Sequence, residues 1–419
     1  MAAITLYDTT LRDGTQMEGI SLSVEDKLKI AVKLDELGIH FIEGGWPGSN
    51  PKDDEFFRKS KSLQLKHSLI TAFGSTRKVD TAPSKDQNLK ALIDSEAPII
   101  TIVGKASETQ VKSVLETSLE ENLNMIRESV QYLKEHGRRV FFDAEHFFDG
   151  YLSNPDYALA SIRAAANAGA EYIVLCDTNG GTLPGEIQEI VGKIAEETSV
   201  PLGIHCHNDS EMAVANSLAA VQAGVSQIQG TINGYGERCG NTNLLSIIAN
   251  LKLKLGVDIV TDEQLETLTE VHRYVSEIAN MPPNRYQAYV GSSAFSHKGG
   301  LHASAMVKDE HSYQHVAPEI VGNTKHIVVS ELAGRSNITV KLEEHKLASH
   351  LSKAQVNELL KDLKARENQG YQYEGAEASF DLLVRRNLPG YKPPFELVDF
   401  LVVMEKRRRQ SKKTTDTES

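Results

Sequence analysis

Short apolar runs alternate with longer segments of helical periodicity over roughly the first 280 residues of the chain. Eight of these runs are predicted to be β-strands: Ile4–Tyr7, His40–Glu43, Ser68–Ala72, Ile99–Val103, Arg139–Asp143, Tyr172–Cys176, Leu202–His207 and Gln227–Thr231. They are short and largely apolar, which is typical of parallel strands that are covered on both faces. Strands that alternate with helices form βαβ units, and eight such units close a (β/α)8 barrel. The chain is therefore predicted to be an α/β protein built on a TIM barrel.

The helices between these strands share a terminating glycine. Gly38, Gly169 and Gly224 each stand between an apolar helical segment and the next strand. Glycine adopts the left-handed conformation that ends many helices, so we expect each to follow the last turn of a helix. The repeated order of helix, glycine and strand supports a barrel over an accidental run of elements.

The barrel is expected to occupy residues 1–280, because a predicted helix over Thr261–Ala279 is followed by the break Met281-Pro282-Pro283. Residues 281–330 are rich in Gly, Ser and His and have little periodicity. Residues 331–394 are predicted to form a small helical subdomain, because helical periodicity returns over Glu343–Arg366. Residues 395–419 begin with the strand-like run Phe395–Glu405, which has no obvious partner strand, and end in a basic and polar tail.

Composition narrows the classes of protein that the chain could represent. The hydrophobic share of 40% and the charged share of 24% are those of a soluble globular protein. A net charge of -12 argues against broad binding of nucleic acid or of an anionic membrane surface. Three cysteines without CxxC spacing indicate a reducing compartment, and no secretory or membrane-spanning segment is evident, so a cytoplasmic location is expected.

The clearest chemical signal is a pair of histidines on the seventh predicted strand. His205 and His207 are two residues apart, so both side chains share one face of the strand, which is the barrel lumen. Asp13 follows the first strand, and the carboxyl ends of barrel strands meet at one end of the molecule. Two imidazoles and a carboxylate make a site for Mn²⁺, Zn²⁺, Co²⁺ or Mg²⁺. The alternative is a buried histidine pair, with Asp13 as a turn residue before Gly14.

Three further features lie near the same predicted barrel end. Arg12 can stabilise a developing negative charge on a substrate oxygen, although a loop arginine is the simpler interpretation. Glu145 can act as a general base, position Arg12 or a water, or form an ion pair at the barrel rim. The loop Gly234–Asn241 can bring the Asn241 amide close to the metal, or it can be an ordinary strand-to-helix turn.

Several segments resemble motifs of the DRE-TIM metallolyase superfamily and, within it, of the isopropylmalate/homocitrate/citramalate synthase family: Leu6–Gln16, His205–Asp209 and Gly236–Asn241. The resemblance implies a metal-dependent acyltransferase that joins the methyl carbon of acetyl-CoA to a 2-keto acid. Three other segments are similar to the branch whose keto acid is pyruvate, whose products are (R)-citramalate and CoA, and which serves isoleucine biosynthesis: Gly44–Pro51, Phe142–Gly150 and Cys176–Gly181.

The same resemblance implies roles for individual residues. The metal ligands are Asp13, His205, His207 and Asn241. The residues with catalytic roles are Arg12, Glu145, His302 and Tyr313, and those that bind substrate are Arg12, Asp13 and Thr178, the last at the keto acid's carboxylate. Family members place the segment that matches residues 281–330 over the active site of a neighbouring subunit, which implies a homodimer with subdomain exchange.

One departure from the family concerns the C-terminal end. Family members carry a C-terminal regulatory domain, and residues 395–419 resemble only its first strand followed by a tail, so this domain is expected to be truncated. Alternatives are a 2-isopropylmalate or homocitrate synthase, which acts on a larger 2-keto acid, and a non-catalytic acyl-CoA binder. A lyase of the hydroxymethylglutaryl-CoA type is disfavoured by the residues Gly236–Asn241.

Overall fold

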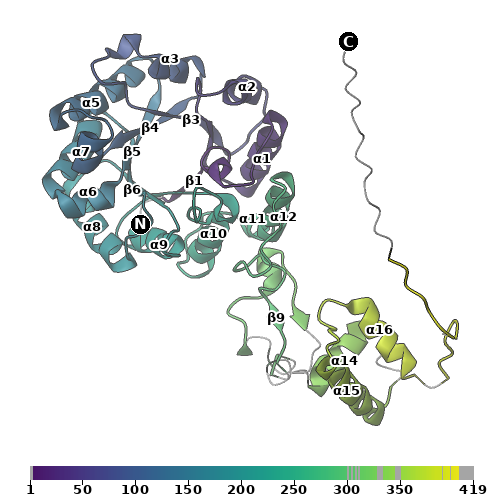
Figure 1. Cartoon of the computed structure of the whole chain (residues 1–419). Helices are drawn as coiled ribbons and strands as arrows, with labels where there is room; N and C mark the ends of the chain where they lie inside the picture. The colour runs from purple at the N-terminus through teal and green to yellow at the C-terminus, as the bar shows by residue number, and fades with distance from the viewer. Residues whose placement is uncertain are drawn as a thin grey trace, which may run out of the picture. The chain divides into compact units, whose positions relative to one another are not determined.

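The computed structural model describes residues 3–299, 302, 305–306, 309, 312–327, 334–344, 351–388, 390–396 and 398–404. Eight parallel strands form a closed barrel in the order of the sequence, and β8 pairs with β1 to close it (Figure 1). The strands are β1 (Thr5–Asp8), β2 (Phe41–Gly45), β3 (Leu69–Ser75), β4 (Ile99–Lys105), β5 (Arg139–Glu145), β6 (Tyr172–Asp177), β7 (Leu202–Cys206) and β8 (Gln227–Gly230). The predicted (β/α)8 barrel is confirmed.

Helices surround the barrel as an outer ring (Figure 1). They are α1 (Val24–Leu37), α2 (Pro51–Ser60), α3 (Gln87–Asp94), α4 (Glu108–Ser113), α5 (Leu119–Glu135), α6 (Phe147–Ser153), α7 (Pro155–Ala168), α8 (Pro184–Glu197), α9 (Ala213–Gln222), α10 (Leu244–Leu253), α11 (Asp262–Leu265) and α12 (Leu268–Ile278). Ser23 caps α1 in a reciprocal capping box with Asp26. Gly38 and Gly169 end α1 and α7 with φ of 90° and 96°, as the glycine pattern predicts.

Several strands extend further towards their carboxyl ends than their apolar residues indicate. The predicted fourth and fifth strands end at Val103 and Asp143, whereas β4 and β5 continue to Lys105 and Glu145. These last residues are charged, so a criterion based on apolar runs excludes them. Because the two strands pair in register to their ends, Lys105 and Glu145 lie side by side. The extension therefore places two charged side chains on the rigid sheet instead of on a loop.

The lower lumen of the barrel is filled by aromatic and polar side chains. Tyr7 packs with Phe41, Ile99 and Phe141 in a small buried cluster. The Tyr7 hydroxyl lies 2.6 Å from a carboxylate oxygen of Glu43, and two threonine hydroxyls also contact it. Burying a carboxylate without such partners would be unfavourable, so this network allows Glu43 to lie inside the barrel.

The chain divides into two compact units. One comprises the barrel residues to Ser296 together with Gln314–His326, and the other comprises His297–Tyr313 together with the residues from Ile327 onwards. The strands β9 (Ser296–His297) and β10 (His326–Ile327) form a two-stranded sheet where the chain passes between the units, and β10 follows a short 3-10 helix at Pro318–Val321. The predicted divisions at residues 280, 330 and 394 stay predictions.

The second unit has an apolar core of its own. Helices α14 (Arg335–Glu344), α15 (Lys353–Asn368) and α16 (Glu377–Arg386) surround buried residues that include Ile338, Leu342, Leu359, Leu363, Phe380 and Val384. The helical pattern expected over Glu343–Arg366 corresponds to the end of α14 at Glu344 and to α15, which begins at Lys353. Ser352 starts α15 by accepting a hydrogen bond from the backbone of Gln355 and forming a capping box.

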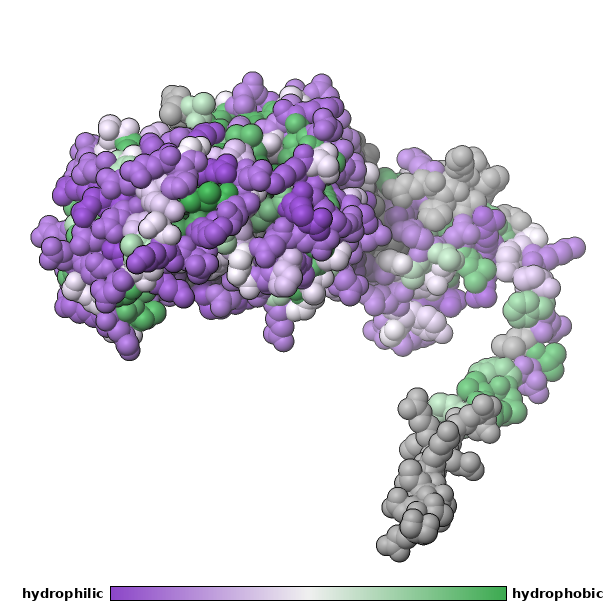
Figure 2. Space-filling model, turned by 90° about the horizontal axis from the view of Figure 1, so that it is seen from above, coloured by the Kyte–Doolittle hydropathy of each residue, from purple (hydrophilic) through white to green (hydrophobic). Residues whose placement is uncertain are grey.

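The segment that follows Pro394 is extended. The strand expected over Phe395–Glu405 is not formed in its described residues, 395–396 and 398–404. A strand needs a hydrogen-bonding partner, and the described part of the chain offers none here. Its apolar side chains are exposed, for example Val398 at 91% and Met404 at 93%, and hydrophobic residues gather along it in Figure 2. No helix among the described residues is long and apolar enough to cross a membrane.

Candidate metal centre and active site

Asp13, His205 and His207 converge at the carboxyl end of the barrel. His205 lies near the end of β7, His207 follows that strand, and Asp13 lies in the loop after β1. The Nε2 atom of His205 is 3.4 Å from Asp13 Oδ2 and 3.4 Å from His207 Nε2. One ligand atom from each residue lies within 4.8 Å of the other two, and all three residues are buried. The structure thus brings together the three residues that the sequence selects as metal ligands.

The hydrogen bonding of these residues fits a divalent cation. Asp13 Oδ1 and Asn241 Oδ1 are buried atoms without a hydrogen-bond partner among the described residues. Buried polar atoms are almost always paired, so an unpartnered oxygen on Asp13, beside His205, and another on Asn241, whose backbone bridges to His207, require an explanation. Carboxylate and amide oxygens together with imidazole nitrogens are suitable ligands for Mn²⁺, Zn²⁺, Co²⁺ or Mg²⁺.

The protonation states of Asp13 and His207 also favour metal binding, because ligand atoms must be free of protons. Burial and the neighbouring His205 lower the pKa of His207 to about 4, so its imidazole is neutral near pH 7. For Asp13, burial alone would raise the pKa, but Arg12 and the two histidines hold the pKa well below its usual range. Burial lowers the pKa of His205, and the Asp13 carboxylate outweighs that effect to raise it overall.

Gln229 and Asp143 orient His205 from within the barrel. The Nδ1–H group of His205 donates to Gln229 Oε1 at 2.9 Å, and Gln229 Nε2 donates to Asp143 Oδ1 at 3.1 Å. This hydrogen bond holds one proton on Nδ1, so Nε2 is the ring nitrogen that faces Asp13 and would bind a metal. Burial raises the pKa of Asp143 to about 7. Sequence reasoning gave no role to Asp143, at the end of the fifth predicted strand, and missed Gln229, although polar side chains at alternate positions of β8, Gln227 and Gln229, are a signal in a barrel strand.

Arg12 links the metal ligands to the buried carboxylate of Glu43. Its Nε donates to Glu43 Oε1 at 2.6 Å, and its Nη1 lies 3.5 Å from Asp13 Oδ2. The guanidinium carbon lies 3.8 Å from the centre of the Phe73 ring, which covers one face. These contacts fix the guanidinium beside Asp13, one of the candidate metal ligands.

Asn241 reaches the site through backbone contacts. A bridge pairs Asn241 with His207, and the Asn241 backbone N–H donates to Gly234 O at 3.1 Å. Gly236 makes room, because a Cβ atom there would collide with the side-chain oxygen of Asn241. The glycine-rich loop therefore holds Asn241 beside the backbone of His207, and the role of Asn241 as a metal ligand stays a prediction.

Thr178 lies in the loop after β6, where several loops meet. Its hydroxyl accepts a hydrogen bond from the backbone N–H of His146 at 2.8 Å, which leaves the hydroxyl proton available for a ligand. Arg238 donates to the Thr178 carbonyl at 2.8 Å and binds Asp209 through two further hydrogen bonds. Arg238 therefore ties the loops that follow β6, β7 and β8 together around the site.

His302 and Tyr313 lie together in the second compact unit, whereas the other candidate residues belong to the first. Their rings are stacked with centroids 4.3 Å apart and an interplanar angle of 28°. Both side chains are exposed, Tyr313 at 51%. The pairing of the two side chains was not apparent from the sequence, and their roles stay predictions.

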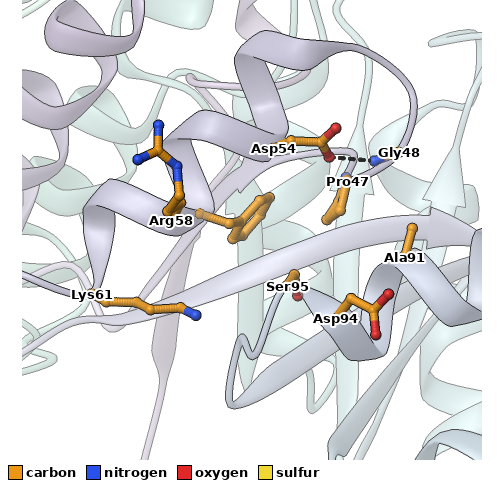
Figure 3. Close-up of a pocket in the computed structure, with 9 residues that line it drawn as sticks. Pro47, Gly48, Asp54, Arg58, Lys61, Ala91, Asp94 and Ser95 are labelled. Carbon is orange, nitrogen blue, oxygen red and sulfur yellow. Dashed lines mark hydrogen bonds between the residues drawn. The ribbon is translucent and has the colours of Figure 1, made fainter.

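A separate pocket of about 430 Å³ lies between α2 and α3 (Figure 3). Its walls carry both cations and carboxylates, and the Gly48 backbone donates to Asp54 at 2.7 Å. The lining residues are Pro47, Gly48, Asp54, Phe57, Arg58, Lys61, Ala91, Asp94 and Ser95. None of the predicted site residues lines it, so the pocket is distinct from the metal centre.

Comparison with known proteins shows to which protein family the chain belongs. Residues 3–275 match the family model described as HMGL-like, and residues 289–371 match the model described as homocitrate synthase post-HMGL domain-like. The chain belongs to the HMGL-like family of TIM-barrel proteins.

Within this family the chain belongs with the (R)-citramalate synthases. It is 54% identical to the (R)-citramalate synthase of Geobacter sulfurreducens and 53% identical to that of Aquifex aeolicus, over 98% and 99% of this chain and 78% of each relative. A 2-isopropylmalate synthase of Sulfolobus acidocaldarius is 35% identical over 90% of this chain and 94% of its own length.

Among solved structures, the hydroxymethylglutaryl-CoA lyase of Bacillus subtilis resembles the barrel with a TM-score of 0.58. It is 18% identical and covers 68% of this chain and 96% of its own. At that identity the likeness concerns the fold.

Proposed function

We propose that this chain condenses acetyl-CoA with pyruvate and releases (R)-citramalate and CoA, as an acyltransferase of isoleucine biosynthesis. The observation that carries the proposal is the identity of 46–54% with five (R)-citramalate synthases over 92–99% of the chain. Three 2-isopropylmalate synthases, one of them designated probable, match at only 34–36%. The converging ligand atoms at the barrel end supply a site at which this chemistry can occur.

Asp13, His205, His207 and Asn241 would hold a divalent metal ion. Bound there, the ion would act as a Lewis acid that polarises the keto oxygen of pyruvate. The unpartnered oxygens of Asp13 and Asn241 and the neutral imidazole of His207 support this ligand set. Gln229 keeps His205 in the tautomer that directs Nε2 towards the same point.

Arg12 and Thr178 would bind the keto acid. The Arg12 guanidinium stands beside the metal ligands and stabilises the negative charge that develops on the keto oxygen during attack. Thr178 has a hydroxyl proton available to donate to the pyruvate carboxylate, since its oxygen already accepts from His146. Asp13 binds the keto acid indirectly, as a ligand of the metal.

The reaction needs a base that removes a proton from the acetyl methyl group. Glu145 and the pair His302 and Tyr313 are the candidates. The resulting enolate carbon forms a bond to the keto carbon, the keto oxygen takes up a proton, and water then cleaves the thioester to release CoA. The stacked His302 and Tyr313 would act from a neighbouring subunit in a homodimer with subdomain exchange. A cytoplasmic location stays a prediction.

The decisive experiment measures release of CoA from acetyl-CoA with pyruvate, 2-ketoisovalerate and 2-ketoglutarate in separate assays. We expect the highest kcat/KM with pyruvate, and chiral analysis should identify (R)-citramalate as the product. Preference for 2-ketoisovalerate or 2-ketoglutarate would replace the proposal by a 2-isopropylmalate or homocitrate synthase. Binding of acetyl-CoA without CoA release in any assay would indicate an acyl-CoA binder.

A further inference from the structure

We propose that Lys105 is a further catalytic residue, whose ammonium group binds the thioester oxygen of acetyl-CoA while the methyl group loses its proton. The inference rests on the proposed function, because it assigns a role within that condensation. It also selects Glu145 as the base, for reasons of position and charge.

Lys105 and Glu145 form an ion pair at the ends of neighbouring strands. They are register partners, the last residues of β4 and β5, and the Lys105 Nζ contacts a carboxylate oxygen of Glu145. Their positions on rigid strands fix this contact more firmly than two loops could.

The pair faces the barrel lumen. Side chains two residues apart on a strand share a face. Thr101 contacts the Tyr7 hydroxyl inside the barrel, so Lys105, four residues further on β4, points the same way. Asp143 accepts a hydrogen bond from Gln229 across the lumen. Glu145, two residues further on β5, therefore also points into the lumen. The ion pair thus lies at the same end of the barrel as the metal ligands.

Both side chains are accessible to a substrate, because their exposed fractions are 19% for Lys105 and 26% for Glu145. Within the described residues, the Lys105 ammonium has Glu145 as its single hydrogen-bond partner. An ammonium group has three donors, so two remain for a ligand. Arg12, by contrast, is already engaged by Glu43 and Asp13.

The chemistry of enolate formation explains why a cation should contact the base. Glu145 takes a proton from the acetyl methyl group and becomes neutral. The electron pair of the broken C–H bond moves into the thioester, and negative charge appears on its oxygen. Lys105 therefore exchanges one anionic partner, the carboxylate, for another, the enolate oxygen. A fixed cation at the point where charge develops lowers the barrier to this step.

The test compares Lys105→Met and Lys105→Arg with the matched control Lys112→Met. Lys112 forms a similar ion pair with Glu108, but on the exposed surface of α4. For Lys105→Met we expect kcat to fall about 10²-fold, as when an oxyanion donor is removed. The KM for pyruvate and the bound metal content should stay unchanged, and Lys105→Arg should keep more activity than Lys105→Met. The control should behave as the wild type.

A second measurement distinguishes a catalytic role of Lys105 from a purely structural one. With trideuterated acetyl-CoA, the kinetic isotope effect should rise in Lys105→Met, because proton removal becomes more nearly rate-limiting. Unchanged kcat in Lys105→Met, or a loss of kcat without a larger isotope effect, would overturn the proposal. If Lys105→Met shows no cooperative unfolding transition and is therefore not properly folded, the same kcat and isotope-effect measurements on Lys105→Gln test the proposal. Wild-type enzyme that releases no CoA would instead refute the proposed function.

Discussion

Arg12 donates a hydrogen bond of 2.6 Å to Glu43, a carboxylate that is completely buried inside the barrel. Glu43 also contacts the Tyr7 hydroxyl, so it connects the filled lower lumen to the residues of the metal centre. This contact fixes the guanidinium between Glu43 and Asp13 and leaves it little freedom to rotate. The position of Arg12 therefore depends on a residue that no motif singled out.

Replacing Arg12 with lysine should lower kcat about 10²-fold or more, because one ammonium group cannot reproduce the donors that hold Glu43 and stabilise the substrate oxygen. Steady-state kinetics with acetyl-CoA and pyruvate would measure this. Arg163→Lys is the control, since Arg163 forms an exposed pair with Glu197. Near-normal kcat in Arg12→Lys would remove Arg12 from the mechanism.

Asp13→Ala and His207→Ala should abolish both turnover and metal binding. Each variant removes one of the four proposed ligands, and the remaining three cannot hold a divalent ion at micromolar concentration. Metal content after gel filtration, measured by elemental analysis, is the readout that does not depend on activity. His136→Ala, which changes an exposed histidine, should bind metal normally. Full metal content in Asp13→Ala would refute the ligand assignment.

Gly236→Ala should weaken metal binding even though Gly236 contributes no ligand. The added methyl group would collide with the Asn241 side-chain oxygen and displace it from the metal centre. Gly185→Ala serves as the control, because a Cβ atom there meets no other atom within 4 Å. Titration with Mn²⁺ followed by electron paramagnetic resonance would compare the affinities. Equal affinities in the two variants would argue against Asn241 as a ligand.

Mixing two inactive variants should restore activity if subdomains exchange between subunits. A mixed dimer of Arg12→Lys with His302→Ala would contain one site that has both native residues, provided that His302 acts on the partner's barrel. Activity should then recover to about a quarter of the wild-type value, since half of the dimers are mixed and each has one intact site. No recovery after denaturation and joint refolding, with dimers verified by light scattering, would place His302 elsewhere.

His272 should make the fold sensitive to acid. It is buried on α12, its Nδ1 contacts Asn233 at 2.7 Å, and burial together with Arg273 lowers its pKa from 6.5 to about 4. Between these values the unfolded chain takes up a proton that the folded chain does not, so stability is full above pH 6.5 and falls as the pH approaches 4.

In His272→Asn, which retains a donor towards Asn233, the acid-induced loss of unfolding free energy should be smaller by on the order of 1 kcal/mol. Urea titrations at several pH values would measure it. Parallel pH profiles for the wild type and the variant would contradict the assignment.

The sequence by itself determined the barrel and the three residues at the core of its candidate metal site. Eight apolar runs separated by amphipathic helices specify a closed parallel sheet, because each run must be covered on both faces. The spacing of His205 and His207 places both on the lumen by the period of a strand, and Asp13 reaches them because all strand ends meet at one side.

Only the tertiary structure decided which other side chains complete the site. Lys105 meets Glu145 through strand register, Gln229 and Asp143 reach His205 across the lumen, and Asn241 approaches His207 through a backbone bridge. Each contact joins residues far apart in the chain, and local periodicity does not reveal which residues meet. Local periodicity determines which face of a strand or helix a residue occupies, whereas strand register and barrel closure determine which other residues it contacts on that face.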